Sequence, residues 1–393
     1  MPDFGHETGG KSSIFIGSVA ASNIRSAVPS QSFCVSVRPF DSFPIAPSAR
    51  KVPGNGISVA RGTALKTGSD ITSIQYLRAI AAISVLCFHV CETYGLDFKS
   101  GAAGVDIFFV ISGFIMWVTT DGRSLGPQEF MWRRLMRIVP LYWIATAATF
   151  IIAVLKPQFF FDTNSSMENL IGSLFFVPLM KDEALHPVVE QGWTLSYEMF
   201  FYLIFSIALL LPEFRRLWLL MAAFVTIVIA HYLLPLGYFS VFTQPVILEF
   251  AAGIIIGHLW KQGFRLPFSA AIGLMIVAVA LLVASDPLIH LERAIRWGIP
   301  AMLLLSGAVF AERERGVPQL AFLHFLGDAS YSIYVWHVLM GVLATALLLR
   351  IGVPHGTQPV FIALGSLAFT IVCYLFIERP ILRKTRSARP RPA

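Results

Sequence analysis

Residues 73–90 read SIQYLRAIAAISVLCFHV, an apolar run that carries an arginine near one end and a histidine near the other. Arg78 and His89 are eleven positions apart, and eleven steps of about 100° along an α-helix return to within about 20° of the same direction. The two side chains therefore share one helix face, with a rise of about 16 Å between them. A guanidinium at the entrance and an imidazole deeper along the face suit an anion that arrives from the arginine end. A neutral imidazole, whose unperturbed pKa is about 6.5, can take a proton from a hydroxyl nucleophile.

A second basic motif, RRLMRIVPLYW at 133–143, places Arg134 and Arg137 one helical turn apart, with Arg133 beside them. Planar guanidinium groups at this spacing can clamp a phosphate. Taken alone, the motif is explained equally well as a loop that only orients the chain in a membrane. If the motif lies on the same side of the membrane as Arg78, it favours a phosphorylated donor that approaches from the cytosol.

A third motif, GWTLSYEMFFYLIF at 192–205, carries an ionisable group inside an apolar run. Glu198 lies about one and a half helical turns into this run. Trp193, Ser196 and Tyr197 offer aromatic and hydroxyl groups that suit a sugar ring. An interfacial aromatic belt explains Trp193 as well, but it does not explain a buried glutamate.

The remaining ionisable groups of the apolar runs are candidates for functional residues. A charge at the centre of a membrane helix costs at least about 2.5–3.5 kcal/mol, so a charge that is retained there is expected to have a role. Asp106 lies near the outer boundary, where a solvated role and a role in substrate binding are evenly balanced. Tyr334 and His337 share one helix face, and chemistry and packing are evenly balanced for His337. We expect Glu249 to join a structural network, and Glu378 to be an interface residue at the end of the last helix.

Membrane helices must position these groups. The chain has 393 residues, of which 56% are hydrophobic and 13% are charged, whereas about a quarter of a soluble domain is charged. Apolar stretches of about twenty residues recur, each long enough to cross about 30 Å of hydrocarbon as a helix. The pattern excludes an outer-membrane barrel, which has short alternating strands. The formal charge of +7 gathers in short loops and in the C-terminal tail, which indicates membrane orientation and no nucleic-acid partner.

The predicted fold is all-α, a polytopic membrane protein with both termini in the cytoplasm, as the basic loops indicate. Residues 169–180 are too short to cross and are expected to be re-entrant or interfacial. Residues 1–72 are predicted to be a disordered tail, 73–383 the transmembrane domain, and 384–393 a basic cytoplasmic tail. Ten spans are expected, at about 74–94, 103–120, 138–155, 193–211, 216–235, 244–260, 267–284, 295–311, 328–349 and 358–378.

Taken in order, the motifs resemble the membrane-bound acyltransferase 3 family, and most of all its exopolysaccharide-production O-acetyltransferases. The resemblance covers about 72–383. The motifs that carry it are Arg78-x10-His89, GVDIFFVISGFIM (104–116), Arg134-x-x-Arg137, WTLSYEMFFYL (193–203), EFAAGIIIG (249–257), SYSIYVWH (330–337) and IERP (377–380).

The resemblance implies an O-acyltransferase of the bacterial cytoplasmic membrane. It would move an acetyl group from cytoplasmic acetyl-CoA to a hydroxyl of an exopolysaccharide, another surface glycan or a lipid-linked precursor. His89, Arg78 and Glu198 are the expected catalytic residues, and Arg133, Arg134 and Arg137 the expected donor-binding ones. The expected acceptor-binding residues are Asp106, Trp193, Ser196, Tyr197, Tyr334 and His337.

No metal is expected, because a thioester is already activated and no metal-ligand spacing occurs. Two points stay open from the sequence. A multi-span transporter or flippase of glycan or acyl groups could use the same buried charges, and His89 could act either as a base or as an acyl carrier.

Overall fold

The computed structural model describes residues 71–120, 125–159, 165–181, 184–285, 288 and 291–387. Apart from its last two residues, the predicted N-terminal tail lies outside the described residues, and so do residues 388–393 of the basic tail. Within the described residues, the chain is helical apart from its connections and one short ribbon. In that ribbon, β1 (Met180–Lys181) pairs antiparallel with β2 (Ala184–Leu185).

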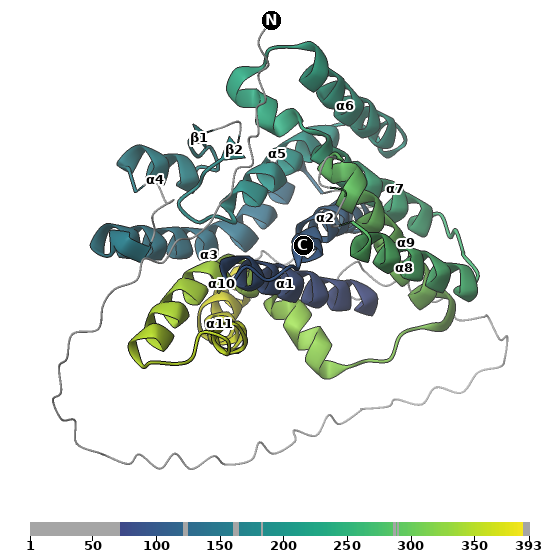
Figure 1. The fold of residues 1–393 in the computed structure, drawn as a ribbon. Helices are drawn as coiled ribbons and strands as arrows, with labels where there is room; N and C mark the ends of the chain where they lie inside the picture. The colour runs from purple at the N-terminus through teal and green to yellow at the C-terminus, as the bar shows by residue number, and fades with distance from the viewer. Residues whose placement is uncertain are drawn as a thin grey trace, which may run out of the picture. The chain divides into compact units, whose positions relative to one another are not determined.

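The α-helices follow one another along the chain, as Figure 1 shows. They are α1 (Thr72–Thr93), α2 (Gly104–Thr120), α3 (Pro127–Leu155), α4 (Met167–Leu174), α5 (Gly192–Ala208), α6 (Glu213–Leu233), α7 (Leu248–Lys261), α8 (Phe268–Val283), α9 (Ile299–Arg315), α10 (Ala321–Arg350), α11 (Gln358–Cys373) and α12 (Arg379–Ser387).

Shorter helical turns complete the described chain. Those of 3-10 type are η2 (Lys99–Ala103), η3 (Pro157–Phe159), η4 (Gly237–Thr243) and η5 (Pro245–Ile247). Two π turns, η6 (Ala294–Gly298) and η7 (Tyr374–Glu378), precede α9 and α12.

Eight helical segments of the described chain are long and apolar enough to cross a membrane. They coincide with eight of the ten predicted spans. The other two, 193–211 and 267–284, form α5 with 17 residues and α8 with 16. At 1.5 Å per residue these helices are about 26 and 24 Å long, which is shorter than the hydrocarbon core. The count of ten and the cytoplasmic position of the termini therefore stay predictions.

The segment 169–180 does not form a spanning helix, in agreement with its length. It contributes to α4, a helix of eight residues. Ser166 caps the start of α4 by accepting a hydrogen bond from the Asn169 backbone N–H at 3.1 Å, which is a common way to begin a helix. Phe176, just after the end of α4, has a positive φ of 62°, so the chain turns there and cannot continue as a helix.

Two glycines bring α2 and α7 into backbone contact. A Cβ on Gly113 would lie 2.1 Å from the Phe250 carbonyl oxygen, and a Cβ on Gly253 would lie 2.0 Å from that of Val110. Only glycine fits such an approach, as is common where membrane helices cross closely. The contact fixes α2, which carries Phe108 and Ser112, against α7.

The first helix packs against several neighbours and positions both residues of the first motif. α1 packs against α10, α2 and α9. Gly327 on α10 faces the backbone of Gln75, because a Cβ there would lie 2.3 Å from the Gln75 carbonyl oxygen. The carboxylate of Glu312 on α9 accepts hydrogen bonds from the backbone N–H groups of Thr72 and Ser73, at 3.1 and 2.8 Å. The first backbone N–H groups of a helix have no acceptor within that helix. Glu312 on α9, which is far from α1 in the sequence, therefore caps the start of α1.

Candidate functional site

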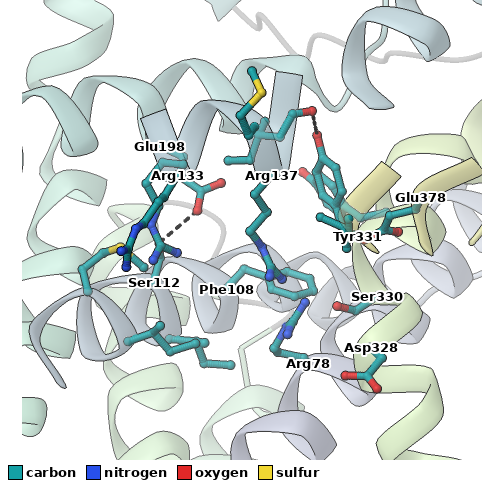
Figure 2. A pocket seen from close by; sticks show the side chains of 18 of the residues that line it. Arg78, Phe108, Ser112, Arg133, Arg137, Glu198, Asp328, Ser330, Tyr331 and Glu378 are labelled. Carbon is teal, nitrogen blue, oxygen red and sulfur yellow. Dashed lines mark hydrogen bonds between the residues drawn. The ribbon is translucent and has the colours of Figure 1, made fainter. Parts of the chain in front are cut away.

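A cavity of about 1650 Å³ lies among α1, α2, α3, α5, α10, η7 and α12. It is larger than the roughly 300–1000 Å³ that encloses most small ligands. Its lining contains more basic than acidic side chains, and part of it is drawn in Figure 2. The basic residues are Arg78, Arg133, Arg134, Arg137, Arg379, Arg383 and Lys384, and the acidic ones are Glu129, Glu198, Asp328 and Glu378.

The exposure of the lining residues separates a mouth from an interior. At the mouth, Trp132 is 61% exposed, and Arg379, Arg383 and Lys384 are exposed as well. In the interior, Ser112, Tyr202, Ser330 and Tyr334 are buried. The cavity therefore leads from a basic entrance into the protein.

Three arginines of the first two motifs converge on this cavity. Arg78 on α1 and Arg137 on α3 direct their guanidinium groups toward each other (Figure 2), and Arg78 also donates a hydrogen bond to Gln75 at 3.3 Å. Arg134 stands over the Phe130 ring at 5.7 Å, and within the described chain its buried Nε has no hydrogen-bond partner. Like charges gathered in a partly buried space repel one another, so this arrangement suits a bound anion.

Arg133, the third arginine of the second motif, lines the same cavity. It forms an ion pair with Glu129 on its own helix. Its charge is therefore already paired within its own helix.

Glu198 points into the cavity from α5 and takes part in a hydrogen-bonded group. Its carboxylate accepts a hydrogen bond from Ser112 Oγ at 2.9 Å, drawn in Figure 2, and another from the Tyr202 hydroxyl. Ser112 belongs to the motif at 104–116, but we did not predict it as a site residue. Nothing in that motif indicates that its serine pairs with a distant glutamate. The pair joins α2 to α5 at the wall of the cavity.

Glu378 is buried, with 3% of its surface exposed, and is not at an interface as we expected from the IERP motif. Its carboxylate accepts hydrogen bonds from the backbone N–H and the hydroxyl of Ser332, at 3.1 and 2.6 Å. The helix continues through Pro380 into α12, because the π turn η7 has already interrupted the regular backbone hydrogen bonding there. The predicted basic tail thus begins inside a helix, and Lys384 lines the cavity.

The two histidines of the predicted site contact each other. The rings of His89 on α1 and His337 on α10 lie 5.2 Å apart between centroids. His89 is half-buried, and its Nδ1 is 3.7 Å from a Glu92 carboxylate oxygen. The motif at 330–337 therefore meets the first motif in space.

Hydrogen bonds determine which nitrogen of His337 carries the proton. Its Nδ1 lies 3.1 and 2.8 Å from the carbonyl oxygens of Ile333 and Tyr334, and a carbonyl oxygen can only accept. Nδ1 is therefore the donor, and Nε2 accepts from the amide nitrogen of Gln191 at 3.3 Å. Gln191 is 3% exposed. Sequence reasoning missed it, because it precedes the third motif without any special pattern.

An aromatic pair of the cavity wall contacts His337 through one of its members, Tyr334. Tyr334 and Phe108 both line the cavity, and their rings are 5.8 Å apart. The Tyr334 ring is also 6.1 Å from that of His337, and its hydroxyl is 2.7 Å from Thr194 Oγ1. Arg78 thus lies in the cavity, whereas neither histidine is among its lining residues. We call Tyr334 and Phe108 the partition.

Asp106 is fully buried, which differs from the partly solvated position considered from the sequence. Its two carboxylate oxygens accept hydrogen bonds from Nε and Nη2 of Arg293, at 3.0 and 2.8 Å. Glu249 is buried near this pair, against Gly298. The pair of Asp106 and Arg293 links α2 to the residue that precedes η6. The structural network expected for Glu249 stays a prediction.

Three further candidates of the third motif lie in packed surroundings outside the cavity lining. Trp193 receives the Arg293 guanidinium over its ring at 5.4 Å. The Tyr197 hydroxyl donates to the Val241 carbonyl, and Ser196 donates to the carbonyl of Gly192, one turn earlier, at 3.3 Å. Their polar groups are engaged within the protein, so the expected contact with an acceptor stays a prediction.

Comparison with known proteins identifies relatives over most of the chain. Residues 71–378 match the family described as an acyltransferase domain. The chain is 39% identical over 310 residues to the exopolysaccharide production protein ExoZ of Rhizobium meliloti, covering 77% of this chain and 96% of that protein. It is 27% identical over 335 residues to the putative membrane-bound transacylase BcsY of Komagataeibacter xylinus, covering 78% and 81%.

A more distant similarity joins the chain to a longer protein. It is 24% identical over 364 residues to the peptidoglycan O-acetyltransferase OatA of Listeria monocytogenes, covering 79% of this chain and 56% of that protein. No solved structure matches the chain.

Proposed function

This chain belongs to the membrane-bound acyltransferase 3 family, and from that premise we propose that it acetylates a cell-surface glycan. It is an acyltransferase and an integral membrane protein. In our proposal the donor is acetyl-CoA from the cytoplasm. The acceptor is a hydroxyl group of an exopolysaccharide, another surface glycan or a lipid-linked precursor, and the enzyme works in the bacterial cytoplasmic membrane.

The observation that carries the proposal is the convergence of Arg78, Arg134 and Arg137 on one large cavity. A coenzyme A donor carries phosphate groups, which guanidinium groups bind well. The unpartnered Nε of Arg134 is a buried donor that an anion could satisfy. The residues present therefore fit this donor, and its thioester would supply an activated acyl group.

The histidines are proposed to handle the proton of the acceptor hydroxyl. His89 is the base, and a positioned base contributes about 10²- to 10⁴-fold to rate. His337 holds the ring of His89 in place, since its own nitrogens are engaged with Gln191 and two carbonyl groups. In this proposal, the partition must move or open a path before a donor in the cavity can meet an acceptor beside His89.

The proposed acceptor is supported by the relatives. One is described as an exopolysaccharide production protein and another as a peptidoglycan O-acetyltransferase. Both descriptions concern polymers made or displayed outside the cytoplasm. A hydroxyl-bearing glycan on the side of His89 is consistent with a donor that enters from the side of Arg78.

The experiment is a donor-consumption assay with the purified full-length protein in lipid nanodiscs. With acetyl-CoA and extracted exopolysaccharide, we expect release of free CoA and new O-acetyl signals in the NMR spectrum of the polysaccharide. His89→Ala should reduce turnover by at least about 100-fold without loss of folded protein. The matched control is His186→Ala, which removes an exposed histidine outside the site. Full turnover in His89→Ala would refute the assignment of the base.

The same protein distinguishes a base from an acyl carrier. After incubation with isotopically labelled acetyl-CoA alone, intact mass measurement would detect an acetylated chain if His89 carries the acyl group. A chain that stays unlabelled while turnover is normal supports direct transfer.

A further inference from the structure

We propose that the mouth of the cavity is a subsite for the 3′-phosphoadenosine end of the donor. In this subsite Trp132 stacks on the adenine ring, and Arg379 and Arg383 hold the 3′-phosphate. The inference rests on the proposed function and extends it, because it assigns a second recognition site at the entrance, formed largely by the C-terminal helix.

The direction of the donor follows from the chemistry of its two ends. The thioester must point toward His89, whose ring contacts His337, and His337 in turn contacts Tyr334, a buried residue of the cavity lining. The adenine end must therefore lie at the exposed mouth. The ribose 3′-phosphate is close to the adenine, whereas the diphosphate lies nearer the middle of the molecule. The diphosphate would then be bound by the deeper arginines, Arg78, Arg134 and Arg137.

Trp132 provides an aromatic surface at the mouth. It lines the cavity and is 61% exposed, just before Arg133 on α3. A purine presents a flat π-face that stacks on an indole, and such stacking accepts any base. A tryptophan at a membrane interface can also be a lipid anchor, and the experiment below separates the two roles.

Arg379 and Arg383 both line the cavity from α12, which packs against α3. Residues four apart lie on one helix face, and like charges at this spacing destabilise the helix. A bound phosphate would remove this repulsion, since guanidinium groups bind phosphate oxygens in pairs.

The carboxylates at the mouth already have other partners. Glu129 is paired with Arg133, and the Asp328 carboxylate lies 3.5 Å from the His324 ring nitrogen. Both are themselves partly exposed, so solvent weakens any longer-range attraction to α12. The mouth therefore retains a positive field that an incoming anion can use.

The test measures binding and does not depend on turnover. Purified full-length protein in nanodiscs is titrated with CoA and with 3′-dephospho-CoA by isothermal calorimetry. We expect the unmodified protein to prefer CoA by about tenfold or more, as for a phosphate held by charged hydrogen bonds. Arg379→Ala and Arg383→Ala should each reduce that preference, and the double variant should bind the two ligands equally. Arg265→Ala, an exposed arginine outside the cavity lining, should leave the preference unchanged.

The adenine contact is tested with a third ligand, 4′-phosphopantetheine, which lacks the nucleotide. Trp132→Ala should weaken CoA and 3′-dephospho-CoA alike by about tenfold or more and leave 4′-phosphopantetheine unaffected. Trp132→Tyr keeps an aromatic face and should bind nearly as well as the unmodified protein. Equal losses for all three ligands in Trp132→Ala would assign Trp132 to folding or lipid anchoring and would overturn this part of the inference.

The possible failures are distinguishable. If the unmodified protein binds none of the three ligands, the proposed function is wrong. If it binds CoA but shows no preference over 3′-dephospho-CoA, or if the double variant keeps that preference, only the proposed subsite is wrong.

Discussion

The imidazole ring of His89 on α1 packs against that of His337 on α10, with 5.2 Å between their centroids. Gln191 and two carbonyl oxygens engage both nitrogens of His337. His337 is thereby fixed in one tautomer and one orientation, and its ring forms a wall for His89. The contact makes the orientation of the base depend on a helix far away in sequence.

This contact predicts that His337 affects turnover by holding the His89 ring in place. His337→Ala should lower kcat by about 10- to 100-fold and leave the affinity for CoA unchanged, because the arginines of the cavity remain. Gln191→Leu, which removes the hydrogen-bond donor, should show a smaller loss of the same kind. Steady-state kinetics with calorimetric CoA binding checks both variants. A parallel loss of CoA affinity would mean that His337 supports the donor cavity instead.

The arginines around the cavity should act on donor affinity. Arg134→Ala and Arg137→Ala should each weaken CoA binding by about tenfold or more, since each removes charged hydrogen bonds to phosphate. The measurement is CoA titration at two salt concentrations, with Arg265→Ala as the control. Unchanged affinity would leave Arg134 and Arg137 with a role in membrane orientation only.

The ion pair between the buried Asp106 and the partly buried Arg293 should matter for stability. Asp106→Asn removes the carboxylate charge that pairs with Arg293. The loss of one partner costs about 3–5 kcal/mol in a fully buried pair, and we expect less here because the Arg293 side chain is 30% exposed. The double variant Asp106→Leu with Arg293→Met should be more stable than Asp106→Leu alone or Arg293→Met alone. Thermal unfolding in nanodiscs measures this. If the single changes are additive in the double variant, the two residues do not interact energetically.

The crossing of α2 and α7 should tolerate no side chain. Gly113→Ala places a Cβ 2.1 Å from a carbonyl oxygen of α7, and overpacking of this kind costs about 1–3 kcal/mol. Gly273→Ala in α8 is the matched control, because its new Cβ meets no atom within 4 Å. That change should be neutral or stabilising by about 0.5–1 kcal/mol. The expected difference is a lower unfolding temperature for Gly113→Ala alone.

Helix positions were the most predictable part of the fold. The apolar runs of the sequence match helices even at 267–284, where α8 begins and ends within one residue of the expected bounds. Whether a helix of this length crosses a bilayer depends on tilt and on local membrane thickness, which a hydropathy pattern does not contain. The same holds for α5. The count of spans therefore depends on more than the sequence.

The sequence predicted those parts of the site that depend on the spacing of residues within one helix. The eleven-residue spacing predicted that Arg78 and His89 share one helix face. Both lie on α1, but only Arg78 lines the cavity, and the partition beside it comes from α2 and α10. Likewise, the Tyr197 hydroxyl donates to Val241, 44 residues later, a partner that the sequence did not indicate. Its contact with an acceptor stays a prediction. Residue type indicates what a side chain can do, whereas its partner is decided by packing.

The π turn at Tyr374–Glu378 has a further consequence for the C-terminal helix. A π turn holds one residue more than an α turn, so every later side chain is rotated by about 100° around the helix axis. The extra residue in the π turn therefore determines that the basic residues of α12 face the cavity. Removing one residue from this turn would keep the composition and charge of the chain end almost intact while directing Arg379 and Arg383 away from the entrance.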